Sequence, residues 1–358
     1  MDNPLPPGSV IGILGGGQLG RMLALSASRL GFDTHIFDPA PNGPAARVAA
    51  RSWAAPWDDD GAVEHFASKC DAITFEFENI PASALAAAAS KAPVRPGRRS
   101  LELTQDRLIE KQFIRDAGCQ TVDFADVNSI SDLEAGLSRL GRPAILKTRR
   151  FGYDGKGQIV IRDETDLETA WRDLGEQPAI LEAFSPFQRE LSIVAARAAN
   201  GEMAIYPLAE NSHEGGILRL SKAPAHVDSA TENSAIEIAR AIGAGLGHIG
   251  VFAVELFDVD GQLIVNEIAP RVHNTGHWTM DACACSQFEQ HMRAVAGWSL
   301  GDTIPHSACE MTNLIGGDVT NWQGLASDAA TCLHLYGKTE ARAGRKMGHI
   351  NRLFPLND

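Results

Sequence analysis

The chain has 358 residues, of which 44% are apolar and 22% charged, and its formal net charge is −13. These proportions are those of a globular chain of two or three domains, and they argue against a disordered or fibrous protein. The acidic balance argues against a nucleic-acid partner, because contacts with phosphates need a basic surface.

Nothing near the N-terminus predicts export. Residues 1–7 lack the basic segment followed by an apolar segment that marks a signal peptide. No apolar run approaches the roughly 20 residues of a membrane-spanning helix. The six cysteines show no paired CxxC spacing, which is typical of reduced thiols. We therefore expect a cytoplasmic protein with no membrane partner.

The first predicted unit is a βαβ motif, which predicts a parallel sheet. Its strand and helix are joined by the turn Gly15-Gly16-Gly17-Gln18-Leu19-Gly20. The predicted elements are strands at Val10–Leu14, Thr34–Phe37 and Ala72–Phe75 and helices at Arg21–Leu30 and Ala82–Lys91.

The glycine-rich turn, with Asp38 downstream, permits three interpretations. It could bind a dinucleotide, with the glycine amides on the pyrophosphate. Its small residues could serve only to let helix and strand pack closely. It could also bind the phosphate of a mononucleotide at the start of a helix. The motif alone is weak, and we favour the mononucleotide.

Beyond the first unit the pattern alternates helices and strands, and the final segment has short strands and turns. Cys283 and Cys285 fall within the last predicted helix, where they point to different faces. The elements are helices at Asp106–Ala117, Glu164–Leu174, Glu232–Leu246 and Asp281–Val295, strands at Ala144–Thr148, Gln158–Ile161, Ala179–Glu182, Val251–Phe257 and Gln262–Ile268, and strand-like runs between Glu190 and Val227.

The loop Gly152-Tyr153-Asp154-Gly155-Lys156-Gly157-Gln158 lies between two predicted strands. Gly157 stands where a Walker A loop needs Ser or Thr, so this is not a P-loop. Three glycines around Lys156 exceed what an ordinary turn needs, and they predict a flap that closes over phosphates.

Lys147 lies at the end of the preceding predicted strand. It could meet an anion there, although alone it would be read as a surface lysine.

Glu255 and Glu267 lie on two strands joined by the turn Asp260-Gly261. Counting from the turn places the two carboxylates roughly opposite each other, among apolar residues. Two such carboxylates repel each other unless a cation joins them. With the neighbouring amide of Asn266, they predict a Mg²⁺ site that would also hold nucleotide phosphates. The alternative is an exposed hairpin face with solvated acids.

Two further segments are rich in hydrogen-bond donors. Arg271-Val272-His273-Asn274-Thr275-Gly276-His277-Trp278 follows the hairpin directly, where a substrate would meet a γ-phosphate. Tyr336-Gly337-Lys338 and Gly344-Arg345-Lys346 form a basic patch near the C-terminus, which could also be an ordinary solubilising surface.

These motifs, in this order, resemble the ATP-grasp superfamily. The glycine-rich turn, Phe75-Glu76-Phe77-Glu78-Asn79 and the segment from Arg271 to Thr279 resemble, within it, the 5-(carboxyamino)imidazole ribonucleotide synthases. The resemblance covers nearly the whole chain. Val272 departs from a usual proline, and Ser185 stands at a hinge position that is often apolar.

The resemblance implies an α/β and α+β fold in three parts. Residues 1–100 would form a Rossmann-like parallel-sheet domain, residues 101–300 an ATP-grasp domain with its small lobe at about 115–185, and residues 301–358 a small β-rich domain. It also implies a homodimer whose small-molecule substrates are ATP, bicarbonate and aminoimidazole ribonucleotide, with ATP and Mg²⁺ as cofactors.

The resemblance also implies a role for individual residues. For the nucleotide these are Arg107, Lys147, Gly152, Tyr153, Asp154, Gly155, Lys156, Gly157, Gln158, Glu182, Ala183, Phe184, Ser185, Glu190, His213, Asn266 and Glu267, and for Mg²⁺ Glu255 and Glu267. For aminoimidazole ribonucleotide they are Gln18, Leu19, Glu76, Asn79, Arg271, His273, Asn274, Lys338, Arg345 and Lys346. The catalytic set would be Tyr153, Asp154, Arg271 and Lys338.

The implied reaction is attack of bicarbonate on ATP, which gives carboxyphosphate and ADP, followed by carboxylation of the amine of aminoimidazole ribonucleotide. A formate-dependent glycinamide ribonucleotide transformylase is an alternative, although its motif has aspartate where this chain has Asn274. An NAD-dependent oxidoreductase would leave the flap and the paired glutamates unexplained. A non-catalytic nucleotide sensor would not need to keep Lys147, Glu255 and Glu267.

Overall fold

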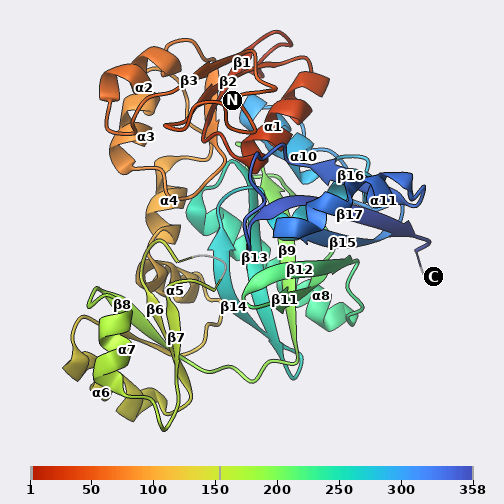
Figure 1. The fold of residues 1–358 in the computed structure, drawn as a ribbon. Coiled ribbons are helices and arrows are strands. Elements are labelled where there is room, and N and C mark those ends of the chain that lie inside the picture. Colours follow the sequence, from red (N-terminus) through yellow and green to blue (C-terminus); the bar gives the residue numbers. More distant parts are fainter. Residues whose placement is uncertain (1–2, 153–154, 357–358) are drawn as a thin grey trace.

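The computed structural model describes residues 3–152 and 155–356. Its strands form three sheets, and Figure 1 shows them as an N-terminal sheet at the top, a small sheet at the lower left and a large sheet between and beside them. No helix within the described ranges is long and apolar enough to span a bilayer.

The N-terminal sheet is parallel, with strand order β3-β2-β1-β4, which confirms the parallel sheet predicted from the βαβ motif. Its apolar strands are buried on both faces, as strands covered by helices must be. The elements are β1 (Val10–Leu14), α1 (Gln18–Arg29), β2 (Asp33–Phe37), β3 (Arg51–Trp53), α2 (Asp60–Ala67), β4 (Ala72–Phe75), α3 (Ala82–Ala89) and α4 (Arg98–Thr104).

The small antiparallel sheet has strand order β5-β8-β6-β7 and its own apolar core. One of its helices, α6, was not predicted, although Ser129 caps it by accepting a hydrogen bond from the amide of Asp132. A Ser-x-x-Asp start followed by Leu133 and Leu137 is a readable helix signal. The elements are β5 (Phe124–Val127), α6 (Ile130–Leu140), β6 (Ala144–Thr148), β7 (Gln158–Ile161), α7 (Leu167–Asp173) and β8 (Ala179–Ala183).

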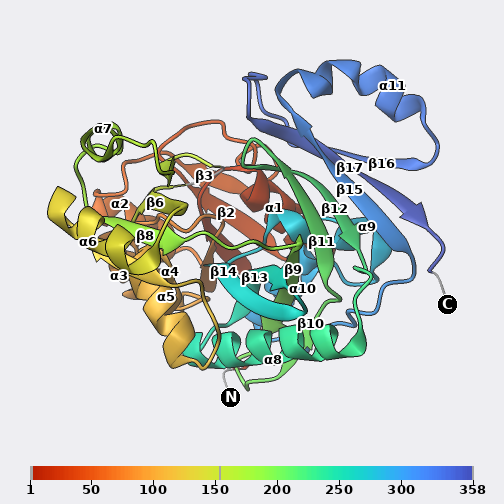
Figure 2. The same cartoon turned by 90° about the horizontal axis from the view of Figure 1, so that it is seen from below.

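The large sheet has the strand order β14-β13-β9-β11-β12-β15-β17-β16, and β10 pairs with β9. Helix α8 packs along it, as Figure 2 shows. The strands are β9 (Arg189–Arg197), β10 (Met203–Ile205), β11 (Ala209–Glu214), β12 (Ile217–Ala223), β13 (Gly250–Val259), β14 (Gln262–Ala269), β15 (Ala308–Ile315), β16 (Thr331–Leu335) and β17 (Lys346–Phe354). The helices are α5 (Arg107–Asp116), α8 (Ser229–Leu246), α9 (Thr279–Ala282), α10 (Gln287–Ala296) and α11 (Trp322–Ser327), with 3₁₀ turns at Asn274–Gly276 and Gly316–Asn321.

The C-terminal strands continue this large sheet. Strand β15 pairs antiparallel with β12, with Leu220 opposite Thr312 and Ala223 opposite Cys309. Residues 301–358, which we expected to form a small β-rich domain, therefore contribute strands that are hydrogen-bonded to the strands of the predicted ATP-grasp part.

The single helix predicted over Asp281–Val295 is wrong. Helix α9 ends at Ala282 and α10 begins at Gln287. Between them Cys283 is extended and bridges to Pro305, while the Ser286 side chain accepts from the amide of Glu289 and caps α10. A cap and a long-range bridge thus interrupt a continuous helical pattern. The cysteines of the described chain are all free thiols.

Candidate active site

The hairpin of β13 and β14 places Glu255 directly opposite Glu267, as the sequence predicts. The turn residues Asp260 and Gly261 both have positive φ, as a two-residue hairpin turn requires. The register shifts between Glu255 and Leu256, because Leu256 faces Val265 while Glu255 faces Glu267. Asn266 is therefore the extra residue of a β-bulge, a feature that redirects side chains next to active sites.

The pKa values of the two glutamates shift in opposite directions. Burial, followed by repulsion from Glu267, raises the pKa of Glu255 to about 7. Burial also opposes ionisation of Glu267, but its ion pair with Arg107, with Nη1 to Oε2 at 2.9 Å, lowers the pKa of that carboxyl. Ionising both groups is costly unless a further cation approaches.

Mg²⁺ fits these donors. In addition to the two carboxylates, the side-chain oxygen Oδ1 of Asn266 is buried without a hydrogen-bond partner. Across the described ranges, no group of three or more His, Cys, Asp or Glu side chains is arranged to hold a metal by itself. Mg²⁺ is usually held by one or two carboxylates together with substrate phosphates, and the hairpin supplies two carboxylates.

Lys147 does meet an anion, namely the buried carboxylate of Glu182. Its ammonium nitrogen lies 2.6 Å from Oε2 of Glu182. The other oxygen, Oε1, lies 3.5 Å from the ammonium of Lys111. Burial would raise the pKa of Glu182, but Lys111 and Lys147 together lower it to about 2.

Helix α5 supplies a charged face that the sequence analysis missed apart from Arg107. Lys111 donates to the backbone oxygen of Asn266 at 2.8 Å, and Glu110 accepts from the amide of Ile268 at 2.7 Å. Burial, followed by repulsion from Glu267, raises the pKa of Glu110 to about 8. The sequence does contain a signal for buried charges here, because Glu110 and Lys111 share a helical face with the fully buried Ile114.

The predicted flap lies between β6 and β7. Its Gly152 oxygen accepts a hydrogen bond of 3.4 Å from Nη2 of Arg107. A Cβ on Gly155 would lie 3.2 Å from the Cα of Gly216, in the turn between β11 and β12. The small lobe therefore touches the large sheet at this point. Tyr153 and Asp154 lie outside the described residues, and Lys156, Gly157 and Gln158 complete the loop.

The hinge predicted over Glu182 to Ser185 begins within β8, where Glu182 pairs with Lys147 and Lys111. Phe184 is half exposed, and the hydroxyl of Ser185 is buried without a partner, while the amide of Ala183 donates to Asp123. Beyond the hinge, Glu190 forms an ion pair with His213. Burial lowers the pKa of His213, but Glu190 and Glu255 outweigh this and raise it.

The donor-rich segment after the hairpin reaches the same carboxylates. Nε2 of His273 lies 3.5 Å from Oε1 of Glu255, and Arg271 forms an ion pair with Glu78. Burial, then Arg271 and Lys346, lower the pKa of His273 to about 3, so its imidazole is neutral. The side-chain amide of Asn274 is paired with that of Asn313.

The glycine-rich turn is already saturated by carboxylates. The amide of Gly16 donates to Asp38 at 2.7 Å, and the amides of Gly17 and Gly20 donate to Glu76 at 2.7 and 3.0 Å. A Cβ on Gly15 or Gly17 would come within 2.5 Å of the Glu76 side chain. The glycines therefore make room for Glu76. These three amides are available neither for the pyrophosphate of a dinucleotide nor for the mononucleotide phosphate that we favoured at this turn.

The basic patch near the C-terminus lies next to this turn. A Cβ on Gly337 would lie 3.6 Å from Nη1 of Arg47 and 3.9 Å from Cζ of Arg21. Lys338 donates to the backbone oxygen of Lys346, and Arg345 to that of Glu340. Sequence reasoning did not assign Arg21 or Arg47. The remaining residues assigned to the ribonucleotide, Gln18, Leu19 and Asn79, lie at the start of α1 and after β4.

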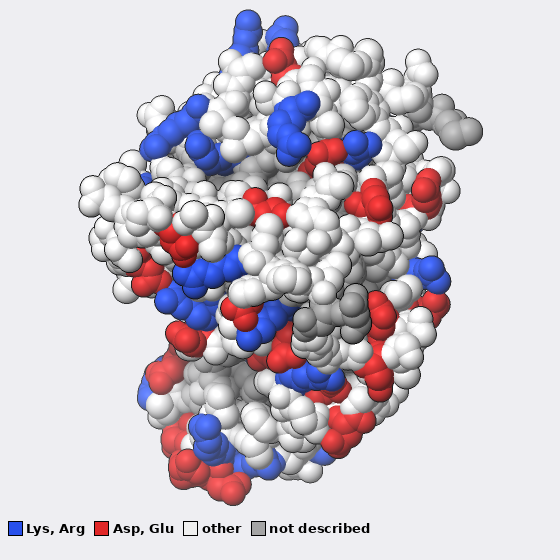
Figure 3. All heavy atoms as spheres, turned by 90° about the vertical axis from the view of Figure 1, so that its right-hand side faces the viewer, with Lys and Arg blue, Asp and Glu red and all other residues white. Residues whose placement is uncertain are grey.

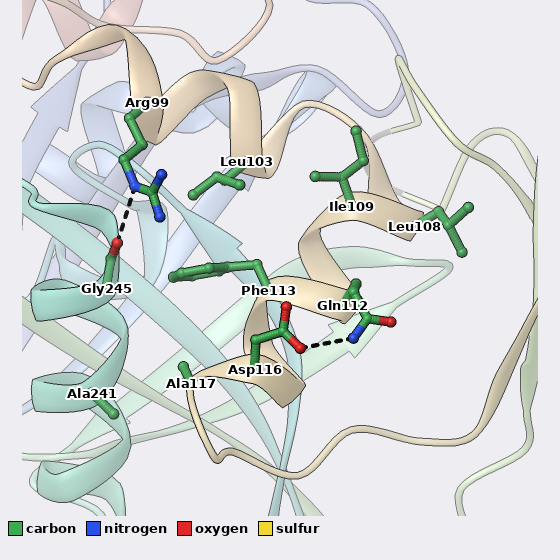
Figure 4. Close-up of a pocket in the computed structure, with 10 residues that line it drawn as sticks. All are labelled: Arg99, Leu103, Leu108, Ile109, Gln112, Phe113, Asp116, Ala117, Ala241 and Gly245. Atoms are coloured by element: carbon green, nitrogen blue, oxygen red, sulfur yellow. Dashed lines mark hydrogen bonds between the residues drawn. The ribbon is translucent and has the colours of Figure 1, made fainter.

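A cavity of about 690 Å³ lies elsewhere, between α4, α5 and α8. Figure 4 shows its mostly apolar lining, in which Arg99 bonds to the backbone of Gly245 and Gln112 to Asp116. Its polar lining residues are thus paired with neighbours, and we do not assign a substrate to it. On the face drawn in Figure 3, basic and acidic side chains are interspersed.

Comparison with known proteins identifies the family. Profiles match at residues 9–105 (ribonucleotide synthetase preATP-grasp domain), 112–288 (ATP-grasp domain) and 309–355 (phosphoribosylaminoimidazole carboxylase C-terminal domain). The N5-carboxyaminoimidazole ribonucleotide synthase of Brucella melitensis is 49% identical over 98% of both chains. The chain belongs to the N5-carboxyaminoimidazole ribonucleotide synthase family. The synthase of Pseudomonas aeruginosa is 46% identical over 95% of this chain and 93% of its own.

Solved structures of this synthase family share the fold. One, an ADP complex, has a TM-score of 0.95 and 40% identity over 99% of this chain and 94% of its own. Another, from Aspergillus clavatus with ADP and 5-aminoimidazole ribonucleotide, has a TM-score of 0.91 and 31% identity over 98% and 95% of the two chains. The predicted ATP-grasp fold is confirmed.

Membership also decides the reaction. The chain is an ATP-dependent ligase of purine biosynthesis, which carboxylates aminoimidazole ribonucleotide to N5-carboxyaminoimidazole ribonucleotide. This confirms the predicted enzyme class. It removes the transformylase, oxidoreductase and sensor alternatives.

Proposed function

We propose that the reaction uses bicarbonate and passes through carboxyphosphate at the two-carboxylate hairpin. The proposal rests on one observation: residues assigned to the nucleotide and residues assigned to the ribonucleotide both contact the glutamate pair, Glu255 and Glu267. Arg107, assigned to the nucleotide, pairs with Glu267, and His273, assigned to the ribonucleotide, lies 3.5 Å from Glu255. A phosphoryl acceptor held between them would lie in reach of both substrates.

Glu255, Glu267 and Asn266 would hold Mg²⁺ together with the phosphates of ATP. The bound ion would neutralise charge on the transferring phosphoryl group. Arg107 and Lys147 would bind phosphate oxygens, and the flap amides with Lys156 would cover them and exclude water. Ala183, Phe184 and Ser185 would contact adenine, and Glu190 with His213 would bind the ribose.

The chemistry has two steps. A bicarbonate oxygen attacks the γ-phosphorus, and the bond from that phosphorus to the β,γ-bridging oxygen breaks, which releases ADP. The exocyclic amine of aminoimidazole ribonucleotide then attacks the carboxyl carbon, phosphate leaves, and the amine loses a proton. Arg271 would orient the anionic reactants, and Tyr153 and Asp154 are our candidates for contacting the amine and accepting its proton.

Aminoimidazole ribonucleotide would lie between the start of α1 and the C-terminal basic patch. Lys338, Arg345 and Lys346 would bind its phosphate through charge-assisted hydrogen bonds. The closeness of Gly337, which precedes Lys338, to Arg21 and Arg47 supports this placement. Gln18, Leu19, Glu76, Asn79, His273 and Asn274 would contact the rest of the molecule. The relative that was solved with ADP and 5-aminoimidazole ribonucleotide supports simultaneous binding of both ligands.

An ATPase assay tests the proposal. ADP release should require Mg²⁺, bicarbonate and aminoimidazole ribonucleotide together. Arg345→Ala should raise the KM for the ribonucleotide on the order of ten-fold or more while that for ATP changes little, because only one substrate loses a phosphate contact. ATP turnover without bicarbonate, or equal changes in both KM values, would contradict the proposed chemistry or the proposed phosphate site respectively.

Two expectations accompany this proposal. We expect a homodimer, which light scattering of the purified protein would measure. We also expect a cytoplasmic location, in keeping with the free thiols of the described chain.

A further inference from the structure

Glu182 has a lysine ammonium near each carboxylate oxygen, but among the described residues only Oε2 accepts a hydrogen bond, from Lys147. Lys147 lies 2.6 Å from Oε2 and Lys111 lies 3.5 Å from Oε1. The Lys111 side chain is 1% exposed, whereas that of Lys147 is 11% exposed. Only Lys147 therefore has part of its surface open to an approaching ligand.

The two lysines differ also in how they are anchored. Lys147 and Glu182 lie on the neighbouring strands β6 and β8 of the small lobe. Lys111 comes from α5, and it donates at 2.8 Å to the backbone oxygen of Asn266, on the β13–β14 hairpin. Lys111 therefore connects the small-lobe carboxylate to the hairpin residue that precedes Glu267.

Helix α5 holds this connection at three consecutive hairpin residues. Arg107 pairs with Glu267, Glu110 accepts from the amide of Ile268, and Lys111 binds Asn266. The opposite face of α5, with Leu108, Ile109 and Phe113, lines the apolar cavity in Figure 4. The helix thus directs its charged face toward the hairpin, and Lys111 has little freedom to move away from it.

If Lys147 binds a phosphate, the phosphate competes with Glu182 for the single charge of its ammonium, although that group has three N–H donors and uses one on Glu182. A buried carboxylate that loses its only counterion is strongly unfavourable. We propose that Lys111 is a positioning residue that remains as the counterion of Glu182 and so allows Lys147 to engage the phosphates of the nucleotide. This inference rests on the proposed role of Lys147, and it gives Lys111 a role without contact to any substrate.

The test is ADP binding by calorimetry in the presence of Mg²⁺, without ribonucleotide or bicarbonate. Lys111→Met should weaken ADP binding on the order of ten-fold, because Lys147 is then needed by Glu182. Adding Glu182→Gln to Lys111→Met should recover most of that loss, because no buried charge remains to be neutralised. A residue that only supported the fold would give no such recovery.

An exposed lysine–glutamate pair provides the matched control. Lys91 lies 3.0 Å from Glu64, and both side chains are about two-fifths exposed. Lys91→Met, alone or with Glu64→Gln, should leave ADP binding unchanged. Wild-type ADP affinity in Lys111→Met, or a loss that persists in the double variant, would overturn the inference.

Folding is measured alongside binding. If Lys111→Met alone does not fold, the double variant tests the inference instead. Replacing the unpaired Glu182 carboxylate with an amide should then restore a folded protein. Failure of both to fold would overturn the inference, because Lys111 would then act through other contacts. The binding assay contains neither bicarbonate nor ribonucleotide, so its result is independent of the proposed carboxylation chemistry.

Discussion

At the scale of single residues, the site is organised by buried charges that need partners. Glu182 is shared by Lys111 and Lys147, Glu267 is paired with Arg107, and Glu255 has a raised pKa. Each of these carboxylates is costly to bury alone. The site therefore favours the binding of cations. Its carboxylates are already paired with lysine and arginine side chains, and a bound nucleotide with Mg²⁺ would add further charges of both signs to these pairs.

Glu267→Gln should lower kcat by at least about 100-fold while the protein remains folded. The change removes one predicted metal ligand and the ion-pair partner of Arg107, so that the phosphates lose alignment. Steady-state kinetics over a range of Mg²⁺ concentrations, together with the thermal midpoint, measure both effects. Glu237→Gln, at an exposed position of α8, serves as the control. Normal turnover by the Glu267 variant would remove this residue from the metal site.

At the scale of elements, the β13–β14 hairpin shows how local geometry sets the site. Its two-residue turn fixes the pairing of the strands, and the bulge at Asn266 then brings Glu267, rather than Asn266, opposite Glu255. Without the extra residue the two carboxylates would point to opposite faces of the sheet, because side chains alternate along a strand.

Gly261→Ala should destabilise the protein by about 1 kcal/mol, since alanine at positive φ is strained. Gly261 has φ +83° and no atom within 4 Å of an added Cβ, so that only the backbone conformation opposes the change. Gly61 in α2 has ordinary φ, and an added Cβ would meet only Oδ1 of Asp59, at an ordinary contact distance of 3.5 Å. Gly61→Ala should therefore be neutral or stabilising. Denaturant midpoints compare the two variants. Equal effects would mean that the turn conformation does not limit stability.

At the scale of the whole molecule, two neutral histidines join the N-terminal part to the large sheet at Val251. Nε2 of His248 donates to the oxygen of Val251, while Nδ1 of His291 accepts from its amide. His248 also bonds to Ser100 in α4, and His291 to Thr74 in β4. Burial lowers the pKa of His248 to about 4 and that of His291 to about 3.

The two buried histidines predict how the free energy of unfolding depends on pH. In the unfolded chain these histidines bind protons below about pH 6.5, whereas in the folded chain they stay neutral until about pH 4 and 3. Their contribution to the free energy of unfolding is therefore complete above pH 6.5. It is lost progressively as the pH falls from 6.5 toward the folded-state pKa values of about 4 and 3. Each histidine contributes a slope of up to about 1.4 kcal/mol per pH unit.

His291→Gln should remove one such slope, measured as the free energy of unfolding between pH 6.5 and 4.5. His248→Gln should act in the same way. Between pH 7 and 8 these variants and the wild type should show the same pH dependence. An unchanged slope in both variants at acidic pH would show that these histidines do not remain neutral in the folded protein.

The sequence by itself determined the features that depend on neighbours along the chain. The parallel βαβ start, the glycine-rich flap between two strands and the acidic hairpin with its Asp260-Gly261 turn all follow from periodicity and turn chemistry. The order of the motifs also indicated the family, and the comparisons confirmed it.

Only the tertiary structure decided which partner each polar group finds. It placed Glu76 and Asp38 on the amides of the glycine-rich turn, and it broke the predicted helix at Cys283 through a bridge to Pro305. It also gave Glu182 its second lysine, Lys111, across 71 positions of the chain. Such pairings depend on segments that meet only after folding, and a buried charge selects its partner by proximity in space, not in sequence.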